Sequence, residues 1–227
     1  MSNLDTSVLD SSSLQGFYSW TDTLKGVYYG PGSVVYALPK LLDALGVKKA
    51  LVVTGRSLRE KVSFVTGSQQ WRSDTPFQTD VVSKVESVLK ECDAFGSTFF
   101  EIVEHSPISC IRNGVQKYKE NGCECIVSVG GGSPIDASKV ILYNIQKEFG
   151  GKTPPQIAIP TTLSAAEYTV STFSCKIITL CSQILQQVET GFTNDEGQKV
   201  AVSSQELAPT GVILDAELTL ATPERLW

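Results

Sequence analysis

Positive charge is scarce in this sequence, and long apolar runs are missing. The 227 residues contain 19 Lys and Arg against 24 Asp and Glu, a net charge of −5. With no basic stripe to displace counterions from phosphates, non-specific nucleic-acid binding is not expected. No apolar run approaches membrane-spanning length, and the polar segment 1–13 lacks the blocks of a signal peptide. We therefore expect a soluble, cytoplasmic protein with neither nucleic acid nor membrane as partner.

Histidine and paired cysteines are also scarce. The one histidine, His105, falls in a predicted loop, where a surface role is the simplest interpretation. The six cysteines include no Cys-x-x-Cys pair, so they are interpreted as reduced thiols that serve as small apolar residues.

Apolar runs that suit buried strands alternate with segments of helical periodicity. We expect a flexible polar tail over residues 1–16 and one α/β domain over 17–227, with a doubly wound, mainly parallel Rossmann-like sheet. Ligands of such sheets bind at the carboxyl ends of the strands. The predicted strands are two short ones within 17–29, then 49–54, 97–103, 125–129, 156–159 and 212–214; the predicted helices are one from Ser33 as N-cap to Gly46, then 79–91, 107–120 and 133–148.

The most informative segment follows the strand 125–129. It reads Gly130-Gly131-Gly132-Ser133-Pro134-Ile135-Asp136, with Lys139 one helical turn later. Glycines let a backbone approach a pyrophosphate closely, and free amides at a helix start, opened here by Ser133 with Pro134 in the first turn, favour an anion. It is neither the G-x-G-x-x-G fingerprint nor a P-loop. A glycine turn that serves only tight strand-to-helix packing is the alternative.

Two motifs together resemble the iron-dependent alcohol dehydrogenases and maleylacetate reductases. They are GGGSPIDASK at 130–139 and Ile-Pro-Thr-Thr at 159–162, and agreement extends from 27–32 to 212–215, 218–219 and 222–223. The resemblance implies a dehydroquinate-synthase-like fold, in which an α/β dinucleotide domain precedes an all-helical metal domain that is absent here. It also implies these cofactor-binding residues: Gly130, Gly131, Gly132 and Ser133 at the pyrophosphate, Asp136 towards the nicotinamide ribose, Thr161, Thr162 and Ser164 along the cleft, and Lys199 at the ribose.

The loop after the first strand bears on the choice between NAD and NADP. Many members of the family carry an acid there, whereas Gly55, Arg56 and Ser57 occupy it here. Arg56 can pair with a 2′-phosphate, which slightly favours NADP over NAD; a solvated loop cation is the alternative. Segment 164–167 is shorter than in the alcohol dehydrogenases and is closer to maleylacetate reductases, so the substrate class stays open.

The resemblance implies an NAD(P)-dependent oxidoreductase that exchanges hydride between nicotinamide and an alcohol or carbonyl carbon. The metal of the family is held by one aspartate and three histidines, which a single histidine cannot supply, so iron or zinc is not expected to bind and no catalytic residue is assigned. We expect a truncated and impaired enzyme. The alternatives are a catalytically inactive nucleotide-binding remnant and a lyase of the dehydroquinate-synthase type; a homodimer is left open.

Segments 62–78 and 170–187 interrupt the resemblance. Both segments begin with Val-Ser and end with Gln. The codons for these residues can contain the outlines of a splice donor and a splice acceptor site, so we hypothesise that the segments are two retained introns. Genuine surface-loop insertions are the alternative, because loops tolerate added residues well. Sequencing the transcript distinguishes the two: reads that carry both segments as coding sequence throughout would exclude retained introns.

Overall fold

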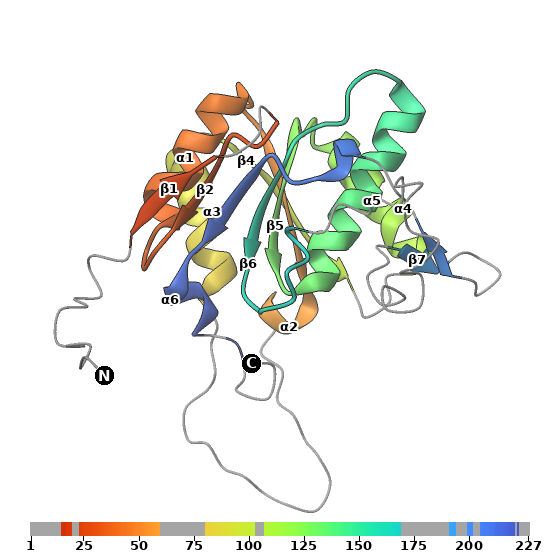
Figure 1. The fold of residues 1–227 in the computed structure, drawn as a ribbon. Coiled ribbons are helices and arrows are strands. Elements are labelled where there is room, and N and C mark those ends of the chain that lie inside the picture. Colours follow the sequence, from red (N-terminus) through yellow and green to blue (C-terminus); the bar gives the residue numbers. More distant parts are fainter. Residues whose placement is uncertain are drawn as a thin grey trace, which may run out of the picture.

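A seven-stranded sheet forms the centre of the molecule (Figure 1). The computed structural model describes residues 15–19, 23–59, 80–102, 107–168, 191–193, 199–201, 205–220 and 222. Neighbouring strands are parallel except for the antiparallel pair at the β1 edge. The order is β1 (Gly16–Tyr18), β2 (Gly26–Tyr29), β9 (Gly211–Leu214), β6 (Gln156–Pro160), β5 (Cys125–Gly130), β3 (Ala50–Gly55) and β4 (Phe95–Ile102); β7 (Gly191–Thr193) and β8 (Lys199–Ala201) form a separate antiparallel pair.

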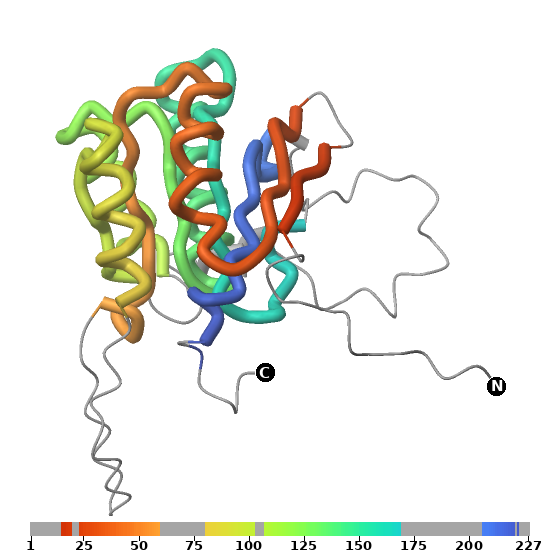
Figure 2. Tube along the Cα trace, turned by 90° about the vertical axis from the view of Figure 1, so that its left-hand side faces the viewer, coloured from red at the N-terminus to blue at the C-terminus, as the bar shows by residue number. Residues whose placement is uncertain are grey.

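Helices cover both faces of the sheet, and each face has its own apolar core (Figure 2). Helices α1 (Val34–Leu45) and α3 (Val81–Glu91) share one buried cluster with Val52 and Val127 of the sheet. On the other face, α4 (Ile108–Glu120) and α5 (Gly132–Phe149) pack on Leu51 and Val53. The predicted doubly wound α/β layout is confirmed. The shorter helices are α2 (Arg56–Arg59), the 3-10 helix η3 (Gln205–Leu207) and α6 (Ala216–Thr219).

The central strands are buried on both faces, and this burial explains their sequences. Strands β3, β5 and β6 consist almost wholly of buried residues, so each is a continuous apolar run rather than an alternating one. No described helix combines the length and apolar character that crossing a membrane requires.

The segments that follow β3 and β5 begin differently from their predictions. The segment predicted as a loop after the first strand is Gly55, the last residue of β3, followed directly by one helical turn that begins at Arg56. Helix α5 begins at Gly132 with Gly131 as its N-cap, so Ser133 lies inside the first turn instead of capping it. A glycine N-cap leaves the first amides without a side-chain acceptor from within the helix.

The described part of the chain begins at the border of the predicted tail. Gln15 Nε2 donates to the Pro31 carbonyl oxygen at 2.9 Å, and β1 begins at Gly16. Residues 1–14 and both predicted insertions, 62–78 and 170–187, lie outside the described residues. Their assignment stays a prediction.

Helix α1 is capped by an aspartate 181 residues away in sequence. Ser33 makes no side-chain capping bond, contrary to the sequence prediction. Instead, the buried Asp215 carboxylate accepts from the Gly32 amide at 2.9 Å and the Val34 amide at 3.0 Å. The same carboxylate caps α6 by accepting from the Glu217 amide at 3.0 Å. Asp215 therefore joins the starts of α1 and α6 at one point.

We predict that Asp215→Ala lowers the free energy of unfolding by about 3 kcal/mol, because it removes a helix cap and leaves buried amides without an acceptor. Chemical denaturation measures the loss. Asp43→Ala, at an exposed carboxylate on the same helix, is the control and should change stability by less than about 0.5 kcal/mol. Equal effects of the two substitutions would contradict the capping role.

The described cysteines are free thiols that differ in burial, and Cys110 is half-buried. Cys92 is exposed, whereas Cys123 and Cys125 are buried. Burial raises the pKa of Cys123 to about 11 and that of Cys125 to about 12. Because the thiolate is the reactive species, we expect these two thiols to react slowly in the folded protein. Their predicted use as small apolar residues is confirmed.

Alkylation at pH 8 should therefore modify Cys92 at least about tenfold faster than Cys123 and Cys125. Peptide mapping by mass spectrometry assigns the modified residues individually. In denaturant, all three should react at similar rates. Fast modification of Cys125 in the folded protein would contradict this prediction and show that the starts of β3 and β5 separate readily.

Candidate functional site

The winding of the sheet reverses between β3 and β5. Although they are direct neighbours, the chain leaves β3 towards α3 on one face and leaves β5 into α5 on the other. The helices that follow these strands thus diverge, and the space outside their carboxyl ends is where doubly wound folds bind ligands. In Figure 1 this edge, with α2 and the start of α5, lies at the bottom.

The glycine turn lies at this reversal. Gly130 ends β5 with a φ of 137°, a conformation that L side chains rarely adopt. A Cβ on Gly131 would lie 3.1 Å from Thr162 Oγ1, and one on Gly132 would lie 3.4 Å from the Ser164 Cβ. A side chain on Gly131 would therefore crowd Thr162, and one on Gly132 would touch Ser164. Amides at the start of a helix lack partners within the helix and favour an anion.

A second turn, residues 161–168 after β6, forms the opposite wall. The Thr161 amide donates to the Gly130 carbonyl at 2.9 Å, so this turn starts level with the glycine turn. Thr161 is buried, and its own carbonyl accepts from the Thr222 hydroxyl. Thr162 is half-buried and Ser164 is exposed. The hydroxyls of these two residues are the ones available to a ligand.

Helix α2 forms the third side. Leu58 Cδ1 lies 3.2 Å from the position of a Cβ on Gly130, and Ser57 Oγ lies 3.8 Å from that of a Cβ on Gly55. Arg56 and Ser57 are exposed to solvent. The structure thus brings together all the sequence-predicted site residues except Lys199, which opens β8 and whose side chain lies outside the described part.

Sequence reasoning missed the polar cluster beneath the glycine turn. Lys139 Nζ donates to Asp136 Oδ1 at 3.1 Å and to the Ala166 carbonyl at 2.7 Å, and it is fully buried. Burial lowers the pKa of Lys139, while the neighbouring Asp136 carboxylate raises it. Burial raises the pKa of Glu167, which is 8% exposed, and the Lys139 charge lowers it. A lysine directly before the apolar run 140–142 was the signal in the sequence.

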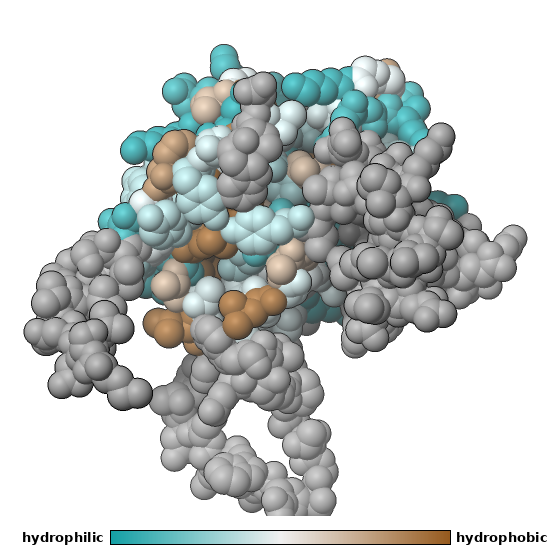
Figure 3. Space-filling model, in the orientation of Figure 1, coloured by the Kyte–Doolittle hydropathy of each residue, from teal (hydrophilic) through white to brown (hydrophobic). Residues whose placement is uncertain are grey.

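Exposed apolar side chains also lie at this edge. Leu163, on the second wall, is 78% exposed, and Leu220, after α6, is 74% exposed. Brown, apolar atoms gather low on the face shown in Figure 3, over the elements at the bottom of Figure 1. The wall of the site is thus partly apolar.

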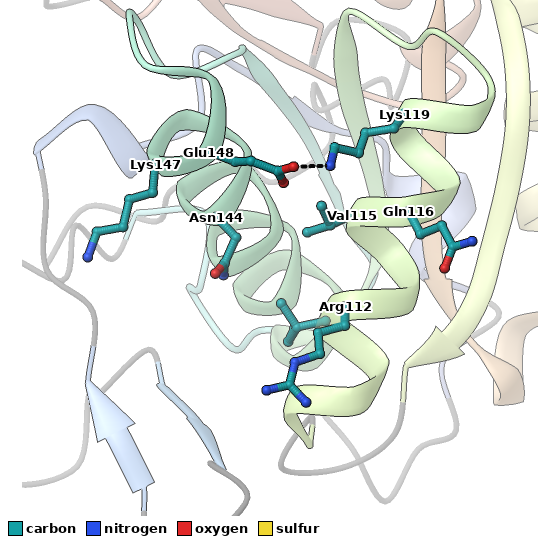
Figure 4. Close-up of a pocket in the computed structure, with 8 residues that line it drawn as sticks. Arg112, Val115, Gln116, Lys119, Asn144, Lys147 and Glu148 are labelled. Atoms are coloured by element: carbon teal, nitrogen blue, oxygen red, sulfur yellow. Dashed lines mark hydrogen bonds and ion pairs between the residues drawn. The ribbon is translucent and has the colours of Figure 1, made fainter.

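A groove between α4 and α5 lies apart from these residues. Its volume is about 570 Å³, and its lining includes Arg112, Lys119, Asn144 and Lys147 (Figure 4). The Lys119 ammonium pairs with the Glu148 carboxylate across it. None of the sequence-predicted cofactor residues lines this groove.

Comparison with known proteins agrees with this geometry. The family model described as iron-containing alcohol dehydrogenase matches residues 25–175. Maleylacetate reductase from Rhizobium sp. (strain MTP-10005) is 27% identical over 206 residues, which are 91% of this chain and 45% of that protein. Its crystal structure aligns with a TM-score of 0.62 and 26% identity over 92% of this chain and 46% of that one. For sulfoacetaldehyde reductase from Bifidobacterium kashiwanohense in complex with NAD+, the TM-score is 0.61 and the identity 20%, over 92% of this chain and 49% of that one.

The fold and the site define a doubly wound α/β domain with a glycine turn at its reversal point. The chain belongs to the iron-containing alcohol dehydrogenase family. It spans less than half the length of the relatives named above. The resemblance inferred from the two motifs is confirmed, and the described part comprises the α/β portion without a helical domain.

The residues of this chain do not supply the ligands of the metal that the family name implies. The resemblance implies one aspartate and three histidines as ligands, whereas the sequence contains only His105, which lies outside the described residues. Within the described ranges, no three His, Cys, Asp or Glu side chains are grouped so as to hold a metal ion. No chemical step of this chain is therefore assigned to iron or zinc.

Proposed function

We propose that this chain binds a nicotinamide dinucleotide at the glycine turn, as the cofactor-binding part of an oxidoreductase. One observation carries the proposal. The start of α5 lies at the reversal between β3 and β5, where a Cβ on Gly131 would lie 3.1 Å from Thr162 Oγ1 and a Cβ on Gly132 would lie 3.4 Å from the Ser164 Cβ. Such a cradle suits a diphosphate, because only backbone amides can approach it so closely.

Each side of the site has a role towards NAD or NADP. The amides of Gly131, Gly132 and Ser133 bind the diphosphate, supported by the positive end of the α5 dipole. Thr162 and Ser164 donate hydroxyls along the cleft, and Asp136 accepts from the ribose side. When bound, the nicotinamide supplies the hydride acceptor or donor.

The reaction is hydride exchange with an alcohol or carbonyl carbon, and its substrate is a small molecule. Since this stretch of chain supplies a single histidine, we propose that the chain alone turns over slowly or not at all. A catalytically inactive nucleotide-binding remnant is the second candidate, favoured by the same count. The cytoplasm is the proposed location, and a homodimer is left open.

Titration calorimetry with NADH and NADPH tests the proposal. Gly131→Val should weaken binding of either dinucleotide by about tenfold or more. The added side chain meets Thr162 and fills the proposed diphosphate site at the glycine turn, which we call the seat. Gly122→Ala is the control: its φ of 57° makes the substitution costly to stability, but nothing lies within 4 Å of the new Cβ and the residue is far from the seat.

Binding by the unsubstituted chain and by Gly122→Ala, but not by Gly131→Val, supports the assignment. Absence of binding of both dinucleotides to the unsubstituted chain would overturn it. An aldehyde-reduction assay on the same samples then separates the two candidates: binding with turnover indicates an enzyme, and binding without turnover an inactive module.

Arg56 generates a separate prediction about the choice of cofactor. Its guanidinium is exposed at the start of α2, where it can pair bidentately with a 2′-phosphate. Arg56→Gln should weaken NADPH binding about fivefold to twentyfold and leave NADH binding within about twofold. Arg59→Gln is the matched control, since the Arg59 guanidinium already pairs with Glu86 at 2.7 Å. An equal loss of affinity for NADH and NADPH in Arg56→Gln would contradict the proposed preference for NADP.

A further inference from the structure

A fully buried lysine lies beneath the glycine turn. Lys139 is on the second turn of α5, among apolar residues, with 0% of its surface exposed. Burial of an ammonium group is costly unless the charge is paired and hydrogen-bonded. Both conditions are met here by Asp136 Oδ1 at 3.1 Å and the Ala166 carbonyl at 2.7 Å.

The two acceptors belong to different walls of the site. Asp136 lies on α5, which begins at the glycine turn, whereas Ala166 lies in the turn after β6. That turn carries Thr162 and Ser164, whose side chains pack against Gly131 and Gly132. One ammonium group therefore connects the helix that starts at the seat to the turn that lines it.

The turn after β6 has a backbone that needs such support. Ala165 has a φ of 56°, in the left-handed region that non-glycine residues seldom occupy. Such conformations persist where the surroundings over-determine them. Here the Tyr168 amide donates to the Ala165 carbonyl at 3.0 Å, and the Lys139 ammonium holds the next carbonyl, that of Ala166.

Charge is the second consequence of this arrangement. Asp136 and the buried Glu167 both place carboxylates near the start of α5, and Glu167 Oε2 has no hydrogen-bond partner within the described part of the chain. A dinucleotide diphosphate brings further negative charge to the same region. The Lys139 ammonium offsets the two carboxylates where like charges would otherwise repel the ligand.

We propose that Lys139 is a positioning residue: it holds the Thr162–Ala166 turn against the glycine turn and offsets the Asp136 charge, so that a nicotinamide dinucleotide meets a preformed seat. Lys139 itself does not touch the ligand. The part of this inference that concerns the ligand rests on the proposed function; the part that concerns the turn does not.

Hydrogen exchange of the unsubstituted chain, Lys139→Met and Val140→Ala, with and without NADH, tests the proposal. In Lys139→Met, the amides of residues 162–167 should exchange at least about tenfold faster, and NADH affinity should fall about tenfold or more. Val140→Ala removes a neighbouring buried side chain of α5, 1% exposed, that belongs to the core cluster of the α4 and α5 face. It should lower global stability but leave exchange at 162–167, and NADH affinity, within about threefold of the unsubstituted chain.

If Lys139→Met does not fold, Lys139→Gln replaces it, since the amide keeps a donor for the Ala166 carbonyl without the charge. In that variant, residues 162–167 should stay nearly as protected as in the unsubstituted chain, while NADH affinity falls. The proposal is overturned if Lys139→Met leaves exchange at 162–167 unchanged, or if Val140→Ala accelerates it equally. Failure of the unsubstituted chain to bind NADH or NADPH would remove the cofactor assignment and the ligand part of the proposal, and the exchange without ligand would still decide the role in the turn.

Discussion

The reversal of winding between β3 and β5 is the constraint on which the site depends. Parallel strands align their carboxyl ends along one edge of a sheet, but most neighbouring ends are covered by helices that follow on the same face. Only where successive helices diverge to opposite faces does the edge stay open. In this chain α3 and α5 diverge in this way, and the residues that follow β3 and β5 are Arg56 and the glycine turn. Fold topology alone thus brings them together.

The edge stays in register because buried polar contacts join parts of the chain that are distant in sequence. Asp215 caps α1 and α6 at once, the Thr222 hydroxyl bonds to the Thr161 carbonyl, and Lys139 bonds to Ala166. Buried polar groups are costly when unpaired, so each of these contacts favours one arrangement of the edge over its alternatives. The apolar clusters stabilise the two layers but do not discriminate as sharply between small shifts along the strands.

The sequence alone predicted most of the layers and part of the site. Strands β3, β5 and β6 were found to within one residue at either end, because burial on both faces makes them continuous apolar runs. The cap of α1 was missed, since Ser33 is the local candidate while Asp215 approaches from 181 residues away. The sequence showed Lys139 one helical turn after the glycine segment, but not the Ala166 carbonyl that it contacts. Contacts that depend on how elements meet are not encoded in the periodicity of either element.

The seat proposed for the dinucleotide consists mainly of backbone. Its contacts come from residues 55–58 and 130–166, which the structure describes without interruption within each stretch. They do not depend on whether segments 62–78 and 170–187 are retained introns or surface-loop insertions, and they require no residue of a metal site. Because backbone amides and a helix dipole bind a diphosphate without any reacting group, binding of the cofactor and transfer of hydride are physically separable properties. The proposed binding of a dinucleotide by this chain therefore does not depend on whether the chain also transfers hydride.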